Sequence, residues 1–155
     1  MEKGYFRRLK EKRKIALIIP SLTLQNAYLD KSKKFVLSAN LLLGHDFLES
    51  ATADLYYSMY YSLLALLFKY GIRSKSHMTS ILFLDILFQR KDLFELMRHA
   101  KRERIDKQHH IETQANSEGV TDLLDKARLF NMEIRQIIIN PIPDVEEIRK
   151  KFKQL

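Results

Sequence analysis

Residues 55–68 read LYYSMYYSLLALLF, the longest stretch of the chain without a charged side chain. It lies within a helix that we expect over residues 47–70, and its apolar side chains cover almost the whole circumference. A helix of this kind belongs at the centre of a bundle, or must also face a second subunit. The stretch is shorter than the ~18–20 residues needed to cross a bilayer, so a buried helix explains it best. Gly71 follows where a left-handed residue ends a helix.

Helical patterns continue on both sides of this stretch. Apolar residues spaced by three, four and seven predict helices over residues 21–43, 77–88, 93–102 and 122–139, and a short basic one over 144–155. We expect Ser76 and Thr121 to cap two of them, and residues 72–76 to form a polar loop. With only 4 glycines and 3 prolines, the chain has too few turn formers for a many-stranded fold. The sequence therefore predicts an all-α fold and no strands.

The chain reads as one domain with basic ends. We expect a basic N-terminal arm over residues 1–20, a helical bundle over 21–139, and a Pro-interrupted basic C-terminal helix or tail over 140–155. The formal net charge of +8 favours an anionic partner such as RNA, DNA or an acidic protein. The charge runs at the two ends are also compatible with simple solvation.

No export signal or membrane span is expected. The apolar run at residues 15–19 stops at Pro20, too short for the core of a signal peptide. The chain has no cysteine, which excludes disulfides, thiolate chemistry and Cys-based zinc sites. The sequence therefore favours a cytoplasmic protein without contact with a membrane.

The distinctive polar segment is residues 104–110, RIDKQHH, in a stretch from 102 to 117 that we expect to be a surface loop or functional edge. Its chemistry suits cleavage of RNA without a metal, because RNA supplies its own nucleophile, the 2′-OH. A histidine titrating near neutrality can move the proton, and an arginine can stabilise the phosphate. The candidate pair is Arg104 and His109, with His110 and Asp106 in support. The cations that would attract the RNA backbone are Lys101, Arg102 and Lys107.

Other chemistry is less well supported. Signatures of phosphate-binding loops, dinucleotide folds, serine hydrolases and zinc proteases are absent. A metal site would have to use His109, Glu112 and His99, which lack a known ligand spacing, so we expect neither metal nor cofactor. The paired tyrosines of residues 56–61 could stack bases, but we favour packing in the core or a dimer. We expect His77 to make a capping or loop contact.

The tyrosine stretch also carries a family resemblance. Residues 51–69, ATADLYYSMYYSLLALLFK, are followed by YGI at 70–72, KSH at 75–77 and later RIDKQ at 104–108. Over about residues 21–139 this pattern resembles the HEPN (higher eukaryotes and prokaryotes nucleotide-binding) domain. The resemblance implies an up-and-down bundle of four to five helices, usually a homodimer.

The resemblance also implies a function. Many HEPN proteins are ribonucleases with an Arg-x(4–6)-His motif near the dimer interface, and many are toxins encoded beside a minimal nucleotidyltransferase antitoxin. On this chain the motif falls on Arg104 and His109, with Arg102/His109 and Arg104/His110 as alternative frames. Arg104 would stabilise charge on the phosphate, and His109 would move the proton.

Two further interpretations stay open. Relatives most similar in the RIDKQ segment often have Tyr in place of His109, which suggests a subfamily not selected for cleavage. The chain could therefore be a non-catalytic partner of a nucleotidyltransferase, or a nucleotide- or RNA-binding helical dimer. It could also be a purely structural dimer with basic ends.

Overall fold

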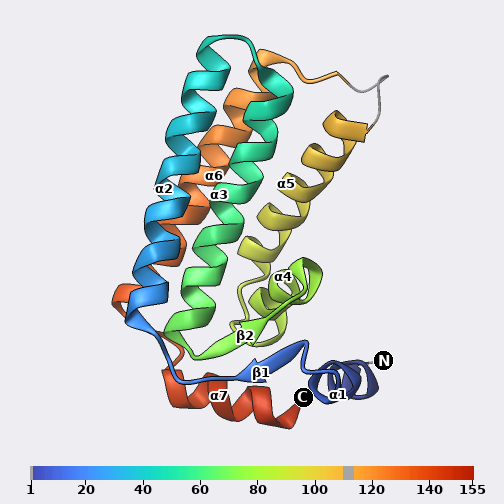
Figure 1. Ribbon diagram of the computed structural model, residues 1–155, viewed down its shortest axis with the longest axis vertical. Helices are drawn as coiled ribbons and strands as arrows, with labels where there is room; N and C mark the ends of the chain where they lie inside the picture. The colour runs from blue at the N-terminus through green and yellow to red at the C-terminus, as the bar shows by residue number, and fades with distance from the viewer. Residues whose placement is uncertain (1, 110–113) are drawn as a thin grey trace.

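The computed structural model describes residues 2–109 and 114–155 (Figure 1). Four long helices run alternately up and down: α2, α3, α5 and α6. The shorter helices and a small sheet close one end, where both termini lie. The elements are α1 (Glu2–Glu11), β1 (Ile15–Leu17), α2 (Leu22–Gly44), α3 (Leu48–Lys69), β2 (Ile72–Ser74), α4 (His77–Ile86), α5 (Lys91–His109), α6 (Ser117–Ile139) and α7 (Val145–Gln154). The all-α prediction is confirmed.

Helix α3 is the central helix of the bundle. It packs against α2, α5 and α6, and the middle of its length has no exposed side of any size. Met59 and Leu63 are completely buried. Burial of such side chains is worth about 1.5–3 kcal/mol each, so the apolar tyrosine stretch supplies much of the core. None of the described helices is long and apolar enough to span a lipid bilayer.

A buried polar network fastens α2 and α6 to α3. The Ser32 hydroxyl of α2 lies 2.8 Å from the Ser62 hydroxyl, which donates to Asn131 Oδ1 of α6 at 2.7 Å. All three side chains are at most 2% exposed. Because buried polar groups are costly when unpaired, this network favours one alignment of the three helices over others.

The closing sheet was not expected from the sequence. Strands β1 and β2 pair antiparallel, with Ile15 opposite Ser74 and Leu17 opposite Ile72. The prediction of a polar loop over 72–76 and of no strands is wrong here. Ile15 and Ile72 are only 1% exposed. Pairing of the strands gives hydrogen-bond partners to backbone N–H and C=O groups that burial would otherwise leave unpaired. A pattern of three residues is too short to reveal a strand by period.

Gly71 turns the chain from α3 into this sheet. Its φ is +67°, the left-handed conformation that its position after α3 predicted. The Arg149 guanidinium of α7 donates to the carbonyl oxygens of Ile18 and Gly71 at 2.9 and 3.0 Å. The C-terminal helix is thereby tied to the connections around the sheet.

The segment expected as a basic arm carries α1 and β1. Phe6 of α1 is fully buried and stacks on Phe83 of α4 at 6.1 Å between ring centres. Phe152 of α7 meets Phe83 edge-on at 5.9 Å. The basic side chains of α1, such as Arg7 and Arg8, remain exposed. The two ends of the chain therefore meet over α4 through aromatic contacts.

Helix α5 extends past the predicted end at Arg102 and reaches His109. The expected loop from 102 is wrong as far as 109, because Glu, Arg, Lys and Gln all favour helix even without an apolar stripe. The Glu103 carboxylate also pairs with Lys107 one turn later, at 3.8 Å. Helix α6 begins at Ser117 with Asn116 as its cap, so the predicted Thr121 cap is wrong too.

Candidate functional site

Helices α3 and α4 bring a histidine and two tyrosines together on the side of the bundle. His77 is the first residue of α4, and the Ser76 hydroxyl accepts from Thr79 N–H at 3.2 Å, so the predicted Ser76 cap is confirmed. The His77 ring stacks on Tyr60 of α3 with 3.9 Å between ring centres and 19° between planes. His77 Nδ1 lies 3.1 Å from the Tyr56 hydroxyl. Stacking on Tyr60 thus fixes the plane of the His77 ring, and the contact with Tyr56 fixes its rotation within that plane, while the residue remains exposed.

Arg104 of α5 covers Tyr56 and its neighbour Tyr57. Its guanidinium carbon lies 4.7 Å from the centre of the Tyr56 ring and 5.6 Å from that of Tyr57, in cation–π contact. Arg104 Nη1 donates to Gln108 Oε1 at 3.5 Å, a weak bond. Its Nε is buried without a hydrogen-bond partner, and within residues 2–109 and 114–155 it forms no ion pair. The guanidinium is therefore held over the two rings, and its charge is not neutralised by an ion pair within the described residues.

The electrostatics of this cluster favour neutral rings beside fixed positive charge. Burial raises the pKa of Tyr56 far above that of an exposed tyrosine, although Arg104 opposes the shift. Burial also lowers the pKa of His77, and the charges of Arg104 and Lys101 lower it further. At neutral pH the phenol keeps its proton and the imidazole is uncharged. The positive charge resides on Arg104 and Lys101.

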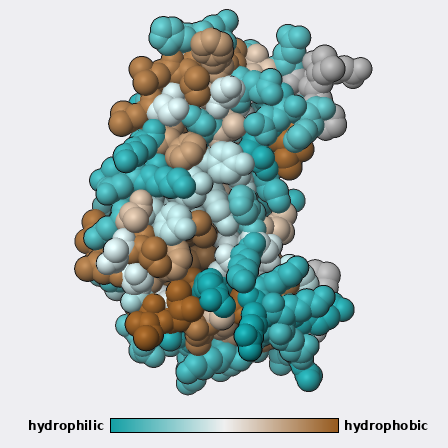
Figure 2. Space-filling model, in the orientation of Figure 1, coloured by the Kyte–Doolittle hydropathy of each residue, from teal (hydrophilic) through white to brown (hydrophobic). Residues whose placement is uncertain are grey.

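The middle of this face differs in character from its borders. Figure 2 shows side chains of intermediate hydropathy over α3, with hydrophilic side chains beside them. Tyr57 is partly exposed, whereas Tyr56 and Tyr60 are buried. The expectation that the tyrosines pack in the core or a dimer is met in the core by Tyr56 and Tyr60, while packing in a dimer stays a prediction for Tyr57 and Tyr61, which are partly exposed. Tyr57 keeps part of its surface toward solvent.

The predicted catalytic pair does not converge within one chain. His109 is the last residue of α5 and is exposed. It follows Arg104 by five positions, which turns it about 140° around the helix. In the alternative frame, Arg102 and His109 are both exposed and share a face, but they are about 10 Å apart along the axis. His110 lies outside the described residues.

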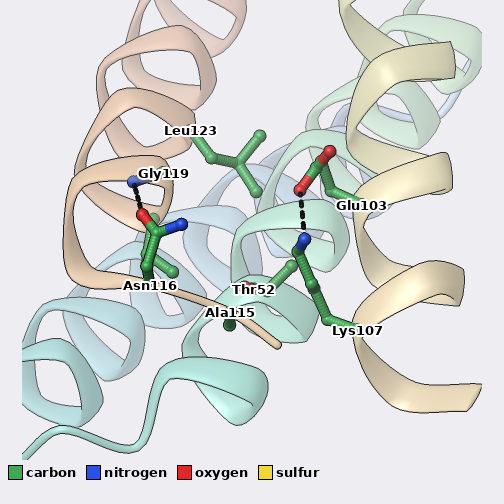
Figure 3. Close-up of a pocket in the computed structure, with 8 residues that line it drawn as sticks. Thr52, Glu103, Lys107, Ala115, Asn116, Gly119 and Leu123 are labelled. Atoms are coloured by element: carbon green, nitrogen blue, oxygen red, sulfur yellow. Dashed lines mark hydrogen bonds and ion pairs between the residues drawn. The ribbon is translucent and has the colours of Figure 1, made fainter. Parts of the chain in front are cut away.

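The predicted RNA-binding cations have different surroundings. Lys107 has a side chain only 17% exposed, which lines a small cavity beside Glu103, Asn116 and Leu123 (Figure 3). Arg102 is exposed, while Lys101 and Asp106 are partly buried. Lys107 is thus turned toward its neighbours in the protein.

No metal centre is formed within the described ranges. There, no three His, Asp or Glu side chains lie close enough to hold an ion. Of the three metal ligands considered from the sequence, His99 is partly buried and His109 is exposed, while Glu112 lies outside these ranges.

The four-helix core and its tyrosine helix define an all-α bundle with a cationic site at α3, α4 and α5. The chain belongs to the HEPN domain family, whose model matches residues 25–137, from the first turn of α2 to the end of α6. No curated protein matches the sequence. Sequence reasoning set His77 and the tyrosines aside, although residues 75–77 and the tyrosine spacing were the signals that marked them.

Proposed function

We propose that this HEPN protein binds RNA and cleaves it without a metal, as the ribonuclease toxin of a toxin–antitoxin pair. One observation carries the proposal: the Arg104 guanidinium is held on the Tyr56 and Tyr57 rings and forms no ion pair within the described residues. A cation held in this way can meet a phosphate without first losing the freedom of a long side chain. The formal charge of +8 would draw RNA to the surface.

Cleavage would follow the chemistry that RNA itself allows. The imidazole of His109 takes the 2′-OH proton as the O2′–P bond forms, and the P–O5′ bond then breaks. The leaving O5′ takes a proton from water, a 2′,3′-cyclic phosphate remains, and His109 returns its proton to the resulting hydroxide. Arg104 stabilises the extra negative charge on the phosphate during the transfer. Since Arg104 and His109 face different directions on one α5, the proposal requires a homodimer in which His109 of one copy meets Arg104 of the other.

The second candidate is a non-catalytic role as the partner of a minimal nucleotidyltransferase or as an RNA-binding dimer. The exposed position of His109 at the end of α5, turned away from Arg104, favours this candidate. In this case Arg104 would still bind phosphate, but no histidine would act on the 2′-OH.

The deciding experiment is cleavage of single-stranded RNA in EDTA at near-neutral pH. We expect cleavage by the wild type and a loss of at least about 100-fold in His109→Ala, because general acid–base catalysis contributes about 10²–10⁴. His45→Ala is the matched control, since His45 is exposed at the end of α2 and outside the site. No cleavage by the wild type on several RNAs, or equal cleavage by His109→Ala, would transfer the assignment to the non-catalytic role.

A further inference from the structure

We propose that Lys101, Arg104 and His77 of one chain form a binding site for a phosphodiester group of single-stranded RNA, with Tyr56 orienting His77 as a hydrogen-bond donor. This inference rests on the proposed function for its ligand, RNA. It goes beyond that function because it assigns the phosphate site to α4 and α5 of a single chain and leaves His109 outside it.

The three donors converge because of where the helices place them. Lys101 and Arg104 are three positions apart on α5 and therefore lie on neighbouring parts of one face. Arg104 lies over the Tyr56 ring, and the hydroxyl of the same ring contacts His77. Burial lowers the pKa of His77, and the charges of Arg104 and Lys101 lower it further, so both cations act on the imidazole. One buried tyrosine thus connects the guanidinium and the imidazole.

The Tyr56 hydroxyl determines which nitrogen of His77 carries the proton. Burial keeps the phenol protonated, and within the described residues its hydroxyl has one hydrogen-bond partner, His77 Nδ1. A neutral imidazole that accepts at Nδ1 carries its hydrogen at Nε2. Stacking on Tyr60 fixes the plane of the ring, so that this N–H is held in one direction. His77 is therefore a fixed, uncharged donor and not a base.

Among the described residues, the charged groups that shift the pKa of His77 are both cations. They are Arg104 and Lys101 on α5, while α3 presents the neutral Tyr56 and Tyr60. The site therefore combines two cations with a neutral donor. Such a set recognises an anion.

A phosphodiester fits this set better than a carboxylate side chain does. The guanidinium fork matches two phosphate oxygens, and a third donor can reach another oxygen of the tetrahedral group. The partly exposed Tyr57 ring lies next to Arg104 and offers a surface on which a base can stack. Bases are free to stack in this way only when the RNA is single-stranded.

The test is the affinity for a fluorescein-labelled single-stranded RNA, measured by fluorescence anisotropy, with every 2′-hydroxyl of the RNA methylated so that the protein cannot cleave it. We expect Arg104→Ala to raise the Kd by at least about tenfold, as loss of a charge-assisted bond implies. His77→Ala should raise the Kd about three- to tenfold, whereas His77→Gln, whose amide keeps an N–H donor, should stay within about twofold. His45→Ala is the control for loss of a histidine. Equal affinity of His77→Ala and His45→Ala would overturn the site.

A titration of the wild-type protein by NMR tests the same site without a variant. A bound anion favours the charged imidazole, so the same RNA should raise the pKa of His77. An unchanged His77 pKa with RNA bound would overturn the proposal. Inorganic phosphate that competes with RNA at equal concentration of phosphate groups would assign the site to free phosphate, against our assignment.

The outcomes separate the two proposals. Loss of binding in His77→Ala together with no cleavage by the wild type would support the phosphate site and contradict the ribonuclease. Cleavage that depends on His109, with binding unaffected by His77→Ala, would support the ribonuclease and contradict the phosphate site.

Discussion

Ser62→Ala tests the polar network that holds the tyrosine helix in place. The Ser62 hydroxyl stands in the middle of this network, 2.8 Å from Ser32 Oγ and 2.7 Å from Asn131 Oδ1. All three residues are buried, so that water cannot replace a lost partner without entering the core. The substitution removes one hydroxyl and changes the volume very little. It therefore isolates the hydrogen bonds from the packing.

The expected loss of stability follows from the groups left behind. Asn131 Oδ1 loses its donor, whereas Ser32 keeps a bond of 2.7 Å to the Ser58 carbonyl oxygen. One unpaired buried acceptor costs about 1–3 kcal/mol, and we take about 2 kcal/mol. For a domain of 155 residues this corresponds to a fall in Tm of about 4–8 °C.

The assay is urea unfolding followed by circular dichroism, at one fixed protein concentration because association would add to the stability. Ser50→Ala is the control, since Ser50 is exposed on the same helix and should change the free energy of unfolding by less than about 0.5 kcal/mol. Asn131→Leu completes a double-mutant cycle. The double variant should lose less stability than the sum of the single variants. A Ser62→Ala protein as stable as Ser50→Ala, or strictly additive effects, would refute the reasoning.

Two further substitutions test the closed end of the bundle. Gly71→Ala should lower the free energy of unfolding by more than about 2 kcal/mol, because φ is positive and a Cβ there would collide with the Arg149 guanidinium and the backbone after β1. Gly44→Ala, where a Cβ meets nothing within 4 Å, should be neutral or slightly stabilising, and equal losses in urea unfolding would contradict this. Phe6→Ala should cost about 3–5 kcal/mol because Phe6 is fully buried, while Leu22→Ala, 68% exposed, should cost little. A thermal scan that finds Phe6→Ala as stable as the wild type would show that α1 is no part of the folded core.

The helices were predictable because their signals are local. The apolar spacing located the long helices, with Ser76 as a cap and Gly71 at a left-handed position. Each of these residues acts on groups within a few positions along the chain, so no knowledge of the partner helix was needed.

The sequence predictions were wrong in two situations. In one, the structure depends on contacts between residues far apart in the sequence; in the other, helix propensity forms a helix that has no apolar stripe. The polar half of α5 has no apolar stripe to reveal it, yet its side chains favour helix and pair one turn apart. The two strands exist because they pair with each other across more than fifty residues. The three-residue strands that begin at Ile15 and Ile72 are too short to show the alternation of apolar and polar residues by which a strand is predicted.

The sequence by itself determined the all-α bundle and its central tyrosine helix, because these follow from composition, periodicity and residue type. Only the tertiary structure decided which groups Arg104 meets. Packing of α3 against α4 and α5 places Tyr56 between Arg104 and His77, while the turn of α5 directs His109 elsewhere. A helix fixes the direction of each side chain by its position, and the neighbours in that direction depend on how separate helices pack.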